Sequence, residues 1–95
     1  MKNFAIHPGT VLAEELAEIG VTLTAAANAL GVPANRLSQI IHGRRSITAD
    51  TALRLAHWLG TSPQFWMSLQ SAFDLAIAEA EIGKVIGKLP KRQAA

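Results

Sequence analysis

The chain has no cysteine among its 95 residues. This absence excludes a disulfide framework, a zinc site built on thiolates and a cysteine nucleophile. Its apolar runs are too short for a membrane-spanning helix, which needs about 18 consecutive apolar residues or more. Pro8 and Gly9 interrupt the first residues before the apolar core of a signal peptide could form. We therefore expect a soluble, cytoplasmic protein with no membrane partner.

Acidic side chains are missing from positions 19 to 49. The formal net charge of the whole chain is only +2, so its charges are unevenly distributed. Glutamates gather at positions 14 to 18, before the gap. Cationic side chains lie within the gap and near the C-terminus, at Arg36, Arg44, Arg45, Lys84, Lys88, Lys91 and Arg92. A basic patch in a nearly neutral chain favours a polyanionic partner, and an ordinary solvated face is the alternative.

Strand signals are poor, because the chain has neither sustained apolar–polar alternation nor a hairpin-turn dipeptide. Helical periodicity recurs within residues 7–20, 21–31, 33–42, 46–60 and 63–82. The predicted N-caps are Thr22 or Thr24 for the second helix, Thr48 for the fourth and Ser62 for the fifth. Pro33 is the predicted first residue of the third helix. We predict an all-α, five-helix fold forming one domain over residues 1–83, followed by a flexible basic tail over residues 84–95.

Apolar stripes on these helices predict the core. Ile19 completes the stripe of the first helix, and Leu53 is assigned to the stripe of the fourth. The aromatic residues Trp58 and Phe65, part of an aromatic cluster in the sequence, are interpreted as core side chains. We expect all four to be buried.

Residues 22–43 combine small and apolar residues with the spacing of a helix-turn-helix. Ala27 would let two helices approach closely, and Gly31 would supply a left-handed turn residue. Leu37 and Ile40 would anchor the second helix, which leaves its polar face free to enter a DNA major groove. Amides can pair with adenine, and arginine with guanine or phosphate. The predicted DNA-binding residues are Thr24, Ala34, Asn35, Arg36, Ser38, Gln39, His42, Arg44 and Arg45.

The fifth predicted helix, over about residues 63–82, has more apolar surface than one small core can cover. A terminal helix of this kind buries the remainder against a partner. We predict a twofold dimer that sets two recognition helices about 34 Å apart, one turn of DNA. The predicted interface residues are Trp66, Leu69, Phe73, Ala76, Ile77 and Ala80.

Catalytic and metal-binding patterns are missing as well. His7, His42 and His57 are dispersed, with no pair four residues apart and no neighbouring carboxylate. Neither a Ser–His–Asp grouping nor a glycine-rich phosphate loop can be argued from the spacings. We expect no enzymatic activity, no metal and no cofactor, and we predict that His7 caps or packs against the first helix.

Three stretches carry a family resemblance: HPGTVLAEEL at 7–16, ALGVPANRLSQIIHGRRSIT at 29–48 and ALRLAHWLGTSPQFWMSLQ at 52–70. They resemble the Cro/C1-type (XRE-like) helix-turn-helix family, and within it the HigA/VapI antitoxin group, with TSPQFW as the distinctive part. Two departures stand out. Pro33 occupies a position where relatives usually have Ser or Thr, which removes a hydroxyl–phosphate contact. Ala25 and Ala26 replace a more usual polar residue and Leu.

The resemblance implies a lambda-repressor-like domain whose last helix dimerises. It also implies a homodimer that binds an inverted repeat of double-stranded DNA and represses its own operon. A further implied partner is a HigB-type, RelE-like toxin, a ribosome-dependent mRNA endonuclease that the antitoxin neutralises. Two alternatives stay open: a stand-alone XRE-family transcription regulator without a toxin, and a protein-interaction module without DNA binding.

Overall fold

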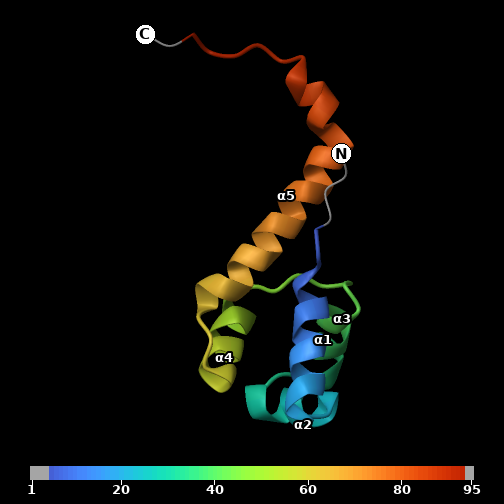
Figure 1. Ribbon diagram of the computed structural model, residues 1–95, viewed down its shortest axis with the longest axis vertical. Helices are drawn as coiled ribbons and strands as arrows, with labels where there is room; N and C mark the ends of the chain where they lie inside the picture. The colour runs from blue at the N-terminus through green and yellow to red at the C-terminus, as the bar shows by residue number, and fades with distance from the viewer. Residues whose placement is uncertain (1–4, 94–95) are drawn as a thin grey trace.

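Five α-helices and no strand make up residues 5–93, the part of the chain described by the computed structural model. They are α1 (Pro8–Ile19), α2 (Leu23–Leu30), α3 (Ala34–Ile41), α4 (Ala49–Leu59) and α5 (Pro63–Gly87). The predicted all-α, five-helix architecture is confirmed. Figure 1 shows α1–α4 packed into one body, with α5 projecting from it. The molecule is therefore elongated and measures 53 × 28 × 21 Å. None of the helices in this range is long and apolar enough to cross a membrane.

Side-chain caps set where the helices begin. Thr22, Thr48 and Ser62 each accept a hydrogen bond from the backbone N–H three residues further on, which satisfies a donor that the helix itself leaves free. The Nδ1 atom of His7 accepts from the N–H of Gly9 at 2.9 Å and caps α1 in the same way. The predicted caps are confirmed, and the choice at α2 falls on Thr22.

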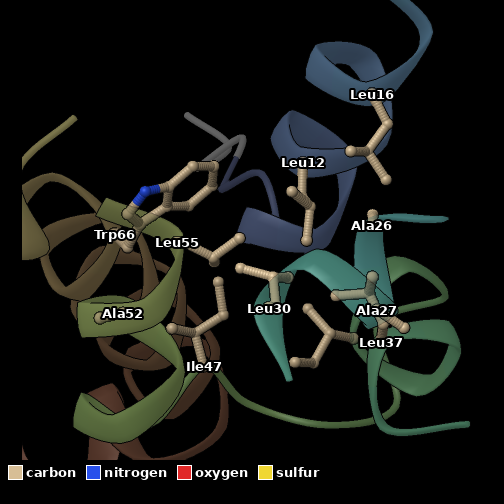
Figure 2. Close-up of a cluster of buried hydrophobic side chains, with 11 residues drawn as sticks. Leu12, Leu16, Ala26, Ala27, Leu30, Leu37, Ile47, Ala52, Leu55 and Trp66 are labelled. Carbon is tan, nitrogen blue, oxygen red and sulfur yellow. The ribbon is translucent and has the colours of Figure 1, made fainter. Parts of the chain in front are cut away.

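One hydrophobic core joins all five helices (Figure 2). Leu12 of α1, Leu37 of α3 and Leu55 of α4 are fully buried there. The small side chain of Ala27 is buried in α2, as a tight helix pair requires. Trp66 brings α5 into this cluster, and its indole N–H donates to Oγ1 of Thr61 at 2.9 Å. The core therefore positions α2 and α3 against the rest of the body.

The backbones of α1 and α3 touch directly. A Cβ atom at Gly9 would overlap the carbonyl oxygen of Ile40, so only glycine fits at this point of α1. Next to this contact the ring of His7 packs edge-on against Phe73 of α5, with ring centroids 4.9 Å apart. The start of α1 is thus packed against the last turn of α3 and against α5.

The tail prediction was wrong for residues 84–87, because α5 continues to Gly87. Gly83 weakens a helix by only about 1 kcal/mol relative to alanine, which the surrounding helix formers overcome. Pro90 comes after the helix has already ended. Residues 1–4 of the predicted domain and 94–95 of the predicted tail lie outside the described residues.

Three predicted core residues lie at the surface: Ile19, Leu53 and Phe65 are 45%, 60% and 43% exposed. Leu53 is two residues from the buried Leu55, about 200° around the helix, and cannot share its face. Phe65 packs edge-on against Trp66 at 5.0 Å, and Trp66 is the one that enters the core. The expectation for Trp58 fits better, since it packs half-buried against the core.

Pro33 also differs from its prediction, because it precedes α3. Its backbone is extended (φ −63°, ψ 144°), and α3 begins at Ala34. The carbonyl of Pro33 accepts from the N–H groups of Arg36 and Leu37, which is the role of a cap residue. Its side chain makes no capping hydrogen bond.

Candidate nucleic-acid interface

The turn between α2 and α3 is closed by the backbone and held by a side chain from α4. Gly31 adopts a left-handed conformation (φ 71°), and the N–H of Val32 donates to the carbonyl of Ala27 at 3.1 Å. Arg54 then donates through Nη1 to the carbonyl of Leu30 at 2.9 Å. Its positive charge lies at the C-terminal end of α2, where it is favourable. Sequence reasoning missed Arg54, because its partner is 24 residues away.

α3 keeps its apolar residues inward and its polar residues at the surface. Leu37 and Ile40 are fully buried and anchor the helix, as predicted. Ala34 and Asn35 are exposed, while Ser38 and Gln39 are half-buried. The predicted base-reading side chains therefore lie on the accessible side of a helix that is fixed from behind.

Two other predicted contact residues lie at the edges of this surface. Thr24 is exposed in the first turn of α2. His42 is exposed at the end of α3, where its Nδ1 lies 2.8 Å from the carbonyl oxygen of Ser38. An imidazole that donates from Nδ1 to this oxygen presents its Nε2 outward.

The loop after α3 folds back over the helix. Gly43 has φ 74°, and the N–H of Arg44 donates to the carbonyl oxygen of Gln39 at 2.8 Å. This reversal brings Arg45 to the side chain of Gln39, and Arg45 Nε donates to Gln39 Oε1 at 2.8 Å. A residue assigned to base reading and one assigned to phosphate binding are thus joined.

Arg36 is tied to α4 and is half-buried. Its Nη1 lies 3.4 Å from Oδ1 of Asp50, which also accepts from Nε of Arg54 at 2.8 Å. The hydrogen bond from Arg54, together with the charges of both arginines, holds the pKa of Asp50 below its ordinary value. The acid lies one position beyond the acid-free stretch, so the sequence alone did not indicate this pairing.

A shallow hollow of about 220 Å³ lies between α3, the loop and the start of α4. Its lining includes two arginines and three hydroxyl side chains, and such groups contact phosphate oxygens in protein–DNA complexes. The carboxylate of Asp50 lies in the same hollow and lowers its positive potential. The lining residues are Arg36, Arg45, Ser46, Thr48, Asp50 and Thr51.

The family model described as "Helix-turn-helix" matches residues 12–66, which contain this whole arrangement. Virulence-associated protein I of Dichelobacter nodosus is 46% identical over 81% of this chain and 72% of its own length. A solved addiction module antidote protein of a HigA family from Coxiella burnetii is 46% identical, with a TM-score of 0.91 over 98% of this chain and 100% of that one.

The chain belongs to the helix-turn-helix family, in its HigA/VapI antitoxin group. A further similar structure is Pseudomonas aeruginosa antitoxin HigA with the higBA promoter. It is 41% identical, with a TM-score of 0.90 over 95% of this chain and 100% of that one. The likeness extends beyond the matched family model to nearly the whole chain, α5 included.

The predicted interface stripe of this HigA-group chain needs one correction. Trp66 is only 1% exposed and belongs to the monomer core, so it has no surface to offer a second copy. Leu69, Phe73 and Ala76 are half-buried, and Ile77 and Ala80 are exposed. The predicted stripe failed at Trp66 because that part of α5 packs on its own domain.

A different apolar stripe of this HigA-group chain is exposed to solvent. It runs along the far part of α5 and just past its end, at side chains that are 46% to 67% exposed. Its members are Leu75, Ile82, Val85, Ile86 and Leu89. Among residues 5–93, His, Asp and Glu side chains do not gather in the groups of three that would hold a metal ion.

Proposed function

We propose that this chain is a dimeric, sequence-specific DNA-binding repressor that acts in the cytoplasm as the antitoxin of a toxin–antitoxin pair and represses its own operon. The observation that carries this proposal is the polar face of α3, which lies at the surface while Leu37 and Ile40 anchor the helix from behind. The similarity to the Pseudomonas aeruginosa antitoxin HigA, whose structure includes the higBA promoter, supports it.

α3 has the dimensions for major-groove binding. An α-helix with its side chains is about 10–12 Å across, which matches the roughly 12 Å width of the groove. Asn35, Ser38 and Gln39 would face base edges. Thr24 and Arg44, at the edges of this surface, would contact phosphates and set the register. Arg36 would contribute once its ion pair with Asp50 yields to a phosphate.

A homodimer would place two such helices on an inverted repeat, about 34 Å apart. The open stripe on α5 supports this arrangement. Leu75, Ile82 and Leu89 follow one another at intervals of seven residues, and Val85 lies between them at coiled-coil spacing. Two copies of this stripe would cover each other. Ile77 and Ala80, the exposed members of the sequence-predicted stripe, form the alternative contact.

A toxin is the second partner in this proposal. The Coxiella burnetii relative is described as an addiction module antidote, which supports an antitoxin role here. The expected toxin is of the RelE-like HigB type and therefore cationic. Glu14, Glu15 and Glu18 are exposed on α1 and offer an acidic surface to such a protein. Co-expression with the neighbouring reading frame tests this part: a small basic protein that co-purifies and no longer inhibits growth is expected.

DNA binding is tested by fluorescence anisotropy with the DNA upstream of the protein's own gene and with shuffled DNA of equal composition. We expect binding to the upstream DNA to be at least about a thousandfold tighter, and to weaken steeply between about 50 and 200 mM salt. Equal binding to both DNAs would overturn the repressor function.

Two glutamine variants provide a matched pair. Gln39→Ala removes a predicted base contact and is expected to cost about 1–3 kcal/mol of binding to the upstream DNA alone. Gln64→Ala removes the same side chain from an exposed position in the first turn of α5 and should leave DNA binding unchanged. Equal losses in the two variants, or equal losses on both DNAs, would contradict the placement of α3 in the groove.

A further inference from the structure

We propose that Arg45 is a positioning residue for base specificity: it holds the side chain of Gln39 so that the pair reads guanine in preference to adenine. This inference rests on the proposed DNA-binding function, and it revises two assignments within it. Gln39 is no longer a free adenine reader, and Arg45 is no longer a simple phosphate contact.

The loop that carries Arg45 is fixed on both sides. On one side, the N–H of Arg44 donates to the carbonyl of Gln39 at 2.8 Å. On the other, Ile47 is buried, and its N–H donates to Oε1 of Gln70 in α5 at 2.7 Å. Arg45 therefore starts from a backbone position that is held against α3 and α5, and its 2.8 Å bond to Gln39 requires no loop rearrangement.

The contact changes what Gln39 offers to DNA. A glutamine amide carries one acceptor oxygen and two N–H donors. Bidentate pairing with adenine needs both kinds of group, because adenine presents the N7 acceptor beside the N6 donor. Here the charged guanidinium of Arg45 already donates to Oε1 of Gln39, in a charge-assisted hydrogen bond. This bond takes one of the two lone pairs of the amide oxygen and leaves the cationic guanidinium beside it, while the Nε2 donors remain.

Apart from the second lone pair of Gln39 Oε1, the remaining groups of the pair are hydrogen-bond donors. Gln39 contributes the N–H groups of Nε2, and Arg45 contributes those of its two Nη atoms, none of which can accept a hydrogen bond. Guanine presents two acceptors in the major groove, N7 and O6, whereas adenine presents one acceptor and one donor. A set of donors fits the guanine edge and meets the adenine N6 donor unfavourably.

Arg44 provides a matched control. It is the neighbouring arginine, it has the same charge, and its side chain forms no hydrogen bond with any group in residues 5–93. If both arginines only contacted phosphates, replacing either one would weaken binding to all sequences alike. A change of base preference confined to Arg45 is a property that simple charge contacts do not produce.

The experiment selects binding sites from a library in which the half-site is randomised, using the full-length protein and its variants Arg45→Lys and Arg44→Lys. Wild type is expected to select guanine at one position of each half-site. Arg45→Lys keeps the charge but loses the planar fork, so the guanine-to-adenine ratio at that position should fall about tenfold. Arg44→Lys should leave the ratio within about twofold of wild type.

A second pair of variants shows whether Arg45 acts through Gln39. In the Gln39→Ala background, Arg45→Lys should change the ratio clearly less than in wild type, because the side chain that Arg45 positions is gone and only its own Nη contacts can still be lost. An equal effect of Arg45→Lys in both backgrounds would overturn the inference, since Arg45 would then read the base alone. Unchanged base preferences in Arg45→Lys would overturn it too. A wild-type protein that selects no sequence at all refutes the repressor function itself.

Discussion

The two halves of α5 are both rich in apolar residues, but one packs against the domain and the other is exposed. The near half, Pro63–Asp74, places Trp66 and Gln70 in the interior of the domain. The far half, residues 75–87, has no buried residue and leaves Leu75, Ile82 and Val85 at the surface. In Figure 1 the near half lies against the body formed by α1–α4, and the far half projects beyond it. Apolar composition alone does not distinguish a core segment from a contact surface, because the two halves differ in whether other helices of the same domain pack against them.

The largest expected effect comes from removing the side chain that ties the near half to the core. Trp66→Ala should lower the free energy of unfolding by about 3–5 kcal/mol, since it empties a fully buried aromatic site. Urea unfolding at several protein concentrations measures this loss separately from association. Phe65→Ala, next to it but 43% exposed, is the control and should cost clearly less. Equal losses would remove the distinction between these two aromatics.

A smaller effect is expected from the polar link of the near half. Gln70→Leu should cost about 1–3 kcal/mol, because it leaves the buried N–H of Ile47 without its acceptor. Thermal unfolding against wild type measures the change. Gln64→Leu makes the same substitution at an exposed position on the same helix and should be nearly neutral. A neutral Gln70→Leu would show that the loop does not depend on α5.

The smallest effect on monomer stability is expected in the far half. Ile82→Asp should change unfolding by no more than about 0.5 kcal/mol, because the side chain is exposed. Its effect should appear in sedimentation instead, where the dimer should dissociate to a 10.1 kDa species. Burying an unpaired charge in an apolar contact accounts for this loss.

Ile77→Asp is a close control, since Ile77 and Ile82 are 45% and 46% exposed and lie about 140° apart around the helix. If Ile77→Asp dissociates the dimer and Ile82→Asp does not, the sequence-predicted stripe is the interface. A wild-type protein that sediments only as the 10.1 kDa species would refute the dimer.

Local chemistry explains which parts of the fold could be predicted. Threonine and serine caps and left-handed glycines act within four residues, so Thr22, Thr48 and Ser62 were recognisable from their neighbours alone. The burial of Leu37 and Ile40 followed from helical periodicity. These features depend on spacing along one helix, which is visible in a sequence.

The failures depend on contacts between distant segments. Periodicity placed Trp66 on an apolar stripe but could not say whether that stripe meets the same domain or a second copy. Gln70 bonds a backbone group 23 residues earlier, and Arg54 bonds one 24 residues earlier, so neither role leaves a local pattern. The link between Gln39 and Arg45 needed the loop reversal at Gly43 to be known.

The missing side chain of Gly9 has a mechanical consequence. Because the backbone of α1 rests directly on that of Ile40, no flexible side chain lies between the two helices to absorb a displacement. We therefore expect α1 and α3 to move as one rigid unit. A protein that binds α1 would then also change the orientation of α3, the helix proposed to enter the DNA groove. In a dimer, such a partner would act by changing the distance and angle between the two copies of α3, while each domain keeps its own structure.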